Sequence, residues 1–177
     1  MSHTQFVAGI DPGRSGAVVV IDVKTGRPVR VYTFDAVGVY TALHNFSVSF
    51  DLSEVPIYIE KVHSSPQMGV VSAFSFGKNF GEILGYVHAC EGLLTQVPPQ
   101  TWQKVVTGEG ETPKERAMDW ARREGVLFRL TTPAGKKPHE GAIDAYGIAR
   151  YGREVILGAF EAPVEAPKKK RPKAVTF

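Results

Sequence analysis

Cysteine is nearly absent from the sequence, with Cys90 as the only one among 177 residues. A disulfide within the chain is therefore excluded, and without paired cysteines and histidines we expect no structural zinc site. Long apolar runs are absent as well, and the first six residues lack the basic start and apolar stretch of a signal peptide. We therefore expect a soluble cytoplasmic protein with no membrane partner.

Net charge is small, and one segment carries it. The formal charge is +3 at pH 7, and from residue 161 onward five basic residues stand against two acidic ones. We expect a single folded domain over residues 1–158 and a basic, proline-flanked flexible tail over residues 159–177. Such a tail either contacts a polyanion such as DNA or stays solvated without a partner.

The hydrophobic pattern predicts strands first and helices later. Short β-branched runs, bounded by glycine, proline and other turn residues, predict five strands at residues 6–11, 17–23, 29–34, 56–60 and 95–97. We expect the first three to be antiparallel neighbours. Further predicted helices follow, so this order indicates an α/β fold with a mixed sheet flanked by helices.

Four helical segments are predicted between and after these strands. One lies near residues 39–46, and a capping box at residues 112–115 begins another that runs to about residue 124. A last helix runs over about residues 138–157. In residues 68–94 apolar side chains recur too densely for one exposed face, so we expect a mostly buried helical stretch, with a dimer interface as one way to cover it.

Four acidic residues are candidates for a common site. Asp11 and Glu60 each end a β-branched strand, where charge is otherwise unfavourable, and adjacent strands would hold them close together. Glu140 and Asp144 are four residues apart and therefore share one helix face, where like charges cost roughly 0.2–0.5 kcal/mol. A bound cation would relieve that repulsion, although a solvated helix face is the alternative interpretation.

Carboxylates gathered in this way favour hard divalent cations such as Mg²⁺ or Mn²⁺. Two such ions about 3.5–4 Å apart can activate the attacking water and stabilise the leaving 3′ oxygen in phosphodiester hydrolysis. No nucleophilic side chain is then required. The acidic residues therefore predict a metal-dependent nuclease.

Three motifs occur in order along residues 6–151. They are Gly-Ile-Asp-Pro-Gly at 9–13, Ile-Glu-Lys-Val at 59–62 and Glu-Gly-Ala-Ile-Asp-Ala at 140–145. Together they resemble the RuvC family of Holliday-junction resolvases, and its phage-type members most closely. The resemblance implies a ribonuclease H-like nuclease domain with a mixed five-stranded sheet, a homodimer, and two Mg²⁺ or Mn²⁺ ions per active site.

The resemblance also implies an activity and a setting. The activity is structure-selective, metal-dependent cutting of four-way (Holliday) DNA junctions in recombination, repair or phage DNA processing. The setting is the cytoplasm of a bacterium or of a phage-infected host cell. Asp11, Glu60 and Asp144 match the family's acids in the first strand, the central strand and the last helix.

Glu140 departs from the family pattern. The family more often has an aspartate there, and bacterial members place the partner acid or histidine three residues before the last acid, where this chain has Gly141. Lys114 matches the family's loop with a catalytic lysine and could steady transition-state charge, or it is a solvated first-turn lysine. His139 could assist a metal ion, although a helix cap is the more ordinary role.

Candidate DNA contacts are less certain from sequence. The family often has an aromatic wedge soon after the central acid, whereas residues 62–68 here contain none. His63 could stack on a base instead, or Phe74 or Phe76 could take that role, unless they belong to the core. Candidate phosphate contacts are Lys61, Lys78 and Lys104. Ordinary surface charge is the alternative interpretation of the same residues.

Three other functions compete with junction resolution. A ribonuclease H-fold nuclease acting on flaps, other branched DNA or RNA–DNA hybrids would use the same carboxylates. A non-catalytic junction-binding protein would fit the Glu140 departure and the missing wedge. A sugar kinase or actin-like ATPase shares the first motif, but it duplicates the fold over a longer chain, so we expect no nucleotide cofactor.

Overall fold

The computed structural model describes residues 4–61, 69–132, 135 and 137–159. A five-stranded mixed sheet has the order β3-β2-β1-β4-β5. The strands are β1 (Phe6–Asp11), β2 (Ala17–Asp22), β3 (Pro28–Thr33), β4 (Ile57–Glu60) and β5 (Leu94–Val97). The first three are antiparallel, and β4 and β5 run parallel to β1, with Ile10 opposite Ile59. The predicted α/β class and mixed five-stranded sheet are confirmed.

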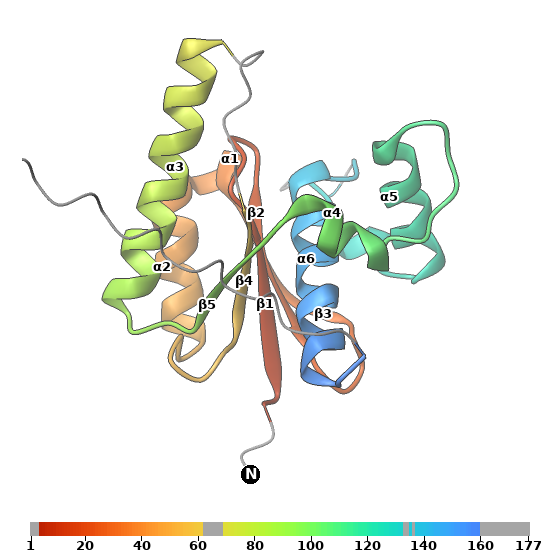
Figure 1. The fold of residues 1–177 in the computed structure, drawn as a ribbon, viewed down its shortest axis with the longest axis horizontal. Coiled ribbons are helices and arrows are strands. Elements are labelled where there is room, and N and C mark those ends of the chain that lie inside the picture. The colour runs from red at the N-terminus through yellow and green to blue at the C-terminus, as the bar shows by residue number, and fades with distance from the viewer. Residues whose placement is uncertain (1–3, 62–68, 133–134, 136, 160–177) are drawn as a thin grey trace, which may run out of the picture.

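Helices cover both faces of this sheet (Figure 1). α2 and α3 lie on one face, with α1 beside them, and α6 lies on the other with α4 and α5. The helices are α1 (Phe34–Val37), α2 (Val39–Ser49), α3 (Val70–Ala89), α4 (Pro99–Trp102), α5 (Pro113–Arg123) and α6 (Glu140–Ile156), with short 3₁₀ turns η1 (Gln103–Val105) and η2 (Leu127–Arg129). The predicted capping box is present, because Thr112 and Glu115 exchange side-chain and backbone hydrogen bonds.

The sheet separates two hydrophobic clusters, as the alternation of side chains along a strand requires. In β1, Val7 belongs to the cluster under α6, whereas Ala8 and Ile10 belong to the cluster under α2 and α3. α6 packs very closely on β1. A side chain at Gly9 would collide with the backbone of α6 at Ala145, so a glycine at this position lets the helix approach.

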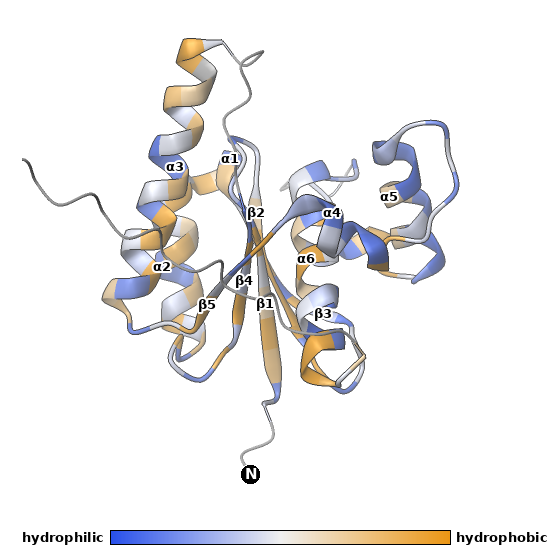
Figure 2. Ribbon diagram, viewed as in Figure 1, coloured by the Kyte–Doolittle hydropathy of each residue, from blue (hydrophilic) through white to orange (hydrophobic). Residues whose placement is uncertain are grey.

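The prediction that residues 68–94 form a mostly buried helix is wrong for the single chain. α3 extends past the sheet (Figure 1), and Val70, Val71 and Phe74 near its start are 86%, 80% and 74% exposed. Ile83 and Val87 alone, among its described side chains, are buried. Apolar residues recur along α3 (Figure 2), and near its start no other described segment covers them.

Two further expectations concern membrane spans and the segments that carry the tail and His63. Among the residues described, no helix combines the length and apolar composition that a membrane span needs. The tail beyond residue 159 and the loop carrying His63 lie outside the described residues. The proposed domain boundary at residue 158 and the role of His63 therefore stay predictions.

Candidate active site

Asp11 and Glu60 lie on the same face of the sheet, at the ends of adjoining parallel strands. Gly9, two residues before Asp11, faces α6. Tyr58, two residues before Glu60, packs in the cluster under α6. Because side chains repeat every second residue along a strand, both carboxylates point to the side on which α6 lies. The parallel pairing of β1 with β4 then places them next to each other.

The turn after β1 holds Asp11 in place. The Gly13 backbone N–H donates a 3.0 Å hydrogen bond to Asp11 Oδ1. The first turn of α6 packs against the same side chain, since a Cβ at Gly141 would lie 3.0 Å from Asp11 Oδ2 and would collide with the Ser15 carbonyl oxygen. No side chain fits at position 141, so a ligand three residues before Asp144 is sterically excluded in this chain.

Asp144 lies one turn further along α6 and faces the strand-end carboxylates. Burial raises the pKa of Asp144 to about 7, and the negative charges of Asp11 and Glu60 add to that shift. Glu140 contributes a smaller part. Burial also raises the pKa of Asp11, although the Gly13 hydrogen bond opposes the rise. The acids are thus close enough to raise one another's proton affinity.

Glu60 has a partner that sequence reasoning missed. The Trp102 indole Nε1–H donates a 3.0 Å hydrogen bond to Glu60 Oε2. Burial and the charge of Asp11 still raise the pKa of Glu60, with this hydrogen bond acting in the opposite direction. Trp102 is 3% exposed, and its ring packs against Gly147 of α6. The sequence did offer a signal for this contact, namely a tryptophan just after Pro98 and Pro99. A tryptophan that is buried in the fold needs an acceptor for its indole N–H.

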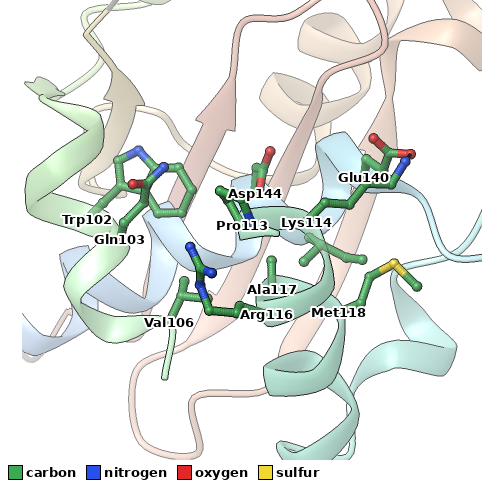
Figure 3. Close-up of a pocket in the computed structure, with 11 residues that line it drawn as sticks. Trp102, Gln103, Val106, Pro113, Lys114, Arg116, Ala117, Met118, Glu140 and Asp144 are labelled. Atoms are coloured by element: carbon green, nitrogen blue, oxygen red, sulfur yellow. Dashed lines mark ion pairs between the residues drawn. The ribbon is translucent and has the colours of Figure 1, made fainter. Parts of the chain in front are cut away.

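Glu140 differs from the other three acids, because it is exposed and already paired. Lys114, at the start of α5, forms an ion pair with Glu140 Oε1, and the two side chains are 59% and 61% exposed. An exposed pair of this kind contributes little to stability. It does place the lysine at one end of the cavity that Asp144 also lines (Figure 3), and its catalytic role stays a prediction.

His139 is a buried helix cap, which answers the question about its role. Its Nδ1 accepts a 3.1 Å hydrogen bond from the Ala142 backbone N–H, and the side chain is 4% exposed. Because Nδ1 accepts, the ring hydrogen sits on Nε2, which lies 3.1 Å from Asp35 Oδ1. Both ring nitrogens therefore have partners other than Asp11, Glu60 and Asp144, although His139 lies close enough to Asp11 to oppose the rise in the pKa of that acid. His139 positions the start of α6 and is not placed as a metal ligand.

The donor set fits a hard divalent cation, although its side chains are not gathered around one point. Asp11, Glu60 and Asp144 offer carboxylate oxygens whose pKa values are raised mainly by burial, and for Glu60 and Asp144 also by neighbouring negative charge. Over the described part of the chain, no group of three or more His, Cys, Asp or Glu side chains is arranged to hold a metal ion. The backbone brings these three acids together, and they are the residues that would hold one.

A cavity of about 340 Å³ opens beside Asp144 (Figure 3). It extends between α6, α5 and the segment from Trp102 to Val106. Lys114 and Glu140 lie toward one end of it, and Trp102 and Gln103 toward the other. The cavity is therefore continuous with the carboxylate site.

The remaining candidate DNA contacts are spread over the molecule. Lys61 directly follows Glu60, and its backbone N–H bonds the Val97 carbonyl oxygen. Lys104 is exposed on η1, near the cavity. Lys78 lies on α3, across the sheet from α6, where it pairs with Glu82 at 3.5 Å. Of these lysines and Lys114, only Lys114 pairs with an acid of the site, and Lys78 lies on the far side of the sheet.

No family model and no curated protein matches this sequence. Solved structures do match the fold. RuvC of T. thermophilus in complex with a Holliday junction substrate aligns with a TM-score of 0.60 at 17% identity, over 87% of this chain and 96% of that one. A second Thermus thermophilus RuvC structure aligns with a TM-score of 0.58 at 19% identity, over 86% and 96%. Identities this low establish the fold alone, and the chain therefore has the RuvC-like form of the ribonuclease H-like fold.

Proposed function

We propose that this protein is a metal-dependent, structure-selective endonuclease that resolves four-way DNA junctions. The observation that carries the proposal is that the backbone places Asp11, Glu60 and Asp144, three partly or wholly buried carboxylates, on one face of a RuvC-like sheet. Burial raises their pKa values, neighbouring acids add to the rise for Glu60 and Asp144, and a divalent cation is a species that would stabilise their charged forms. Mg²⁺ or Mn²⁺ bound there supplies the activation of water and the charge neutralisation that phosphodiester hydrolysis needs.

The chain's own residues have distinct roles in this proposal. Asp11, Glu60 and Asp144 would hold the cations, with the Glu140–Lys114 ion pair beside them. Lys114 lines the cavity beside Asp144, where its charge would stabilise that of the scissile phosphate. Trp102 orients the Glu60 carboxylate through its indole N–H.

The substrate and the assembly are part of the same proposal. The similar T. thermophilus protein was solved with a Holliday junction substrate, which supports branched DNA as the partner here. Two paired nicks require two active sites, and the exposed apolar side chains at the start of α3 offer a surface for a second copy. We therefore include a homodimer in the proposal.

The test is a parallel cleavage assay on end-labelled four-way junction, flap, RNA–DNA hybrid and linear duplex. Wild-type protein with Mg²⁺ or Mn²⁺ should make symmetrical nicks near the branch point of the junction. Asp11→Asn and Asp144→Asn should each lower the rate by at least about 10³-fold while junction binding is retained, because they remove metal ligands and leave the DNA contacts. Glu54→Gln, an exposed acid outside the site, is the matched control.

The outcomes separate the competing functions. Preferential cutting of flaps or hybrids would keep the carboxylate site but replace the substrate. Binding to the junction with no metal-dependent cutting of any substrate would establish a non-catalytic junction-binding protein. Undiminished cutting by either Asp variant would contradict the assignment of the metal site.

A further inference from the structure

The cavity beside Asp144 has the size and the wall chemistry of a site for one small, flat group. Its volume of about 340 Å³ is near the lower end of the about 300–1,000 Å³ typical of small-molecule sites. Apolar walls come from three elements, namely Val106 after η1, Ala117 and Met118 on α5, and Ile143 on α6. Trp102 closes one end. Polar and charged side chains also line the cavity, namely Gln103, Lys114, Arg116, Glu140 and Asp144. A planar ring could therefore pack on the apolar walls while its polar edge meets the polar ones.

Gln103 is a polar side chain at this cavity that no described residue pairs with. Gln103 is exposed and lines the cavity, and over the described ranges its side-chain amide makes no hydrogen bond. Arg116, the neighbouring polar side chain, is already engaged, because its guanidinium donates to the carbonyl oxygens of Gly110 and Glu111 at 3.2 and 3.3 Å. Gln103 therefore offers an adjacent donor and acceptor, the pair that matches the edge of a nucleobase.

The cavity and the carboxylate site share Asp144 as a wall. A nucleotide whose phosphate lies at the carboxylates therefore has its base within reach of the cavity, with the cationic Lys114 at the same edge. Inserting a base costs least where that base is already unpaired, as at a branch point. On the proposed nuclease function, we propose that this cavity receives one unpaired nucleobase next to the scissile phosphate and that Gln103 reads its edge, which makes cleavage sequence-selective.

The first test measures binding, so it does not depend on cutting. Wild-type protein in EDTA is titrated with four-way junctions that each carry one abasic site at successive positions around the branch point. The inference predicts that an abasic site at one position on each cut strand weakens binding by about 5- to 100-fold, the value of one stacked base. Val106→Phe, which fills the cavity, should remove this position dependence.

The second test measures cleavage of junctions with randomised bases around the branch point. Wild-type protein should prefer particular bases at one position next to the cut, and Gln103→Ala should reduce that preference roughly tenfold. Gln100→Ala is the matched control, since Gln100 is an exposed glutamine on the neighbouring α4 that does not line the cavity. It should keep the preference of the wild type.

The two tests distinguish failure of this inference from failure of the nuclease proposal. The cavity inference is overturned if the abasic site weakens binding equally at every position, or if wild type and Gln103→Ala have the same base preference. Either result overturns it even if junctions are cut. A position-dependent abasic effect that Val106→Phe removes supports the cavity inference even if no metal ion supports cutting. In that case only the catalytic proposal fails.

Discussion

At the scale of single residues, burial and like charge act together on Asp144. Its pKa of about 7 in the folded protein is well above its ordinary 3.8, so the folded state binds a proton more tightly than the unfolded state. The contribution of this group to stability is therefore fully present below about pH 4 and is lost as the pH rises to about 7. Without a metal ion, Asp144 is a destabilising residue at neutral pH, as expected for a functional acid.

The Asp144→Asn variant should reverse this penalty. In EDTA at pH 8, urea unfolding should show the variant to be more stable than wild type by on the order of 3 kcal/mol, because the neutral amide needs no proton. The difference should shrink toward zero near pH 4. Mg²⁺ should stabilise wild type and leave the variant nearly unchanged. A variant that is no more stable than wild type at pH 8 would show that the carboxylate carries no such penalty.

At the scale of elements, α6 is held in place at its start and along its length. Its first turn is capped by His139, which also joins it to Asp35 of α1, and its middle lies directly on β1 at Gly9. These contacts set where Glu140 and Asp144 sit relative to the strand-end acids. The position of this one helix therefore determines whether the carboxylates form a site.

The His139 cap can be tested by its conservative replacement. His139→Ala should lower the free energy of unfolding by about 2 kcal/mol, because the cap and a buried side chain are both lost. His139→Asn should lower it by less, since asparagine also caps helices well. Urea unfolding at pH 7 measures both variants. Equal losses would mean that packing, and not the hydrogen bond to the Ala142 N–H, is what His139 provides.

At the scale of the whole molecule, the start of α3 has apolar side chains that no segment within the described ranges covers. Val70, Val71 and Phe74 lie on the opposite side of the sheet from the carboxylates. A second copy packed on this surface would keep the two active sites open, one on each outer side. That arrangement suits a substrate with two strands to cut.

The dimer can be tested by making this surface polar. The double variant Val71→Ser and Phe74→Ser should shift the protein from dimer to monomer at micromolar concentration, because it removes apolar area from the interface core. Light scattering coupled to gel filtration measures the mass. Phe128→Ser is the matched control, since Phe128 is 68% exposed on η2, on the other side of the sheet. A wild-type monomer, or an unchanged mass in the double variant, would contradict the dimer.

The sequence by itself determined the strands, most helices and three acids of the candidate site. Strand alternation and turn residues are local properties, so all five strands were placed within one residue at each end. Asp11 and Glu60 were identifiable because charge ending an apolar strand is unusual, and Asp144 came from the motif of the last helix. The capping box at Thr112 depended only on residues four apart or closer.

Only the tertiary structure decided which distant side chains meet. The Trp102 bond to Glu60, the Asp35 contact with His139 and the pairing of Lys114 with Glu140 join residues far apart in the chain, and no local pattern encodes such pairs. The same holds for the start of α3, where the sequence predicts burial but Val70, Val71 and Phe74 are exposed in the fold. Burial is a property of what packs against a surface, so hydrophobicity alone could not decide it.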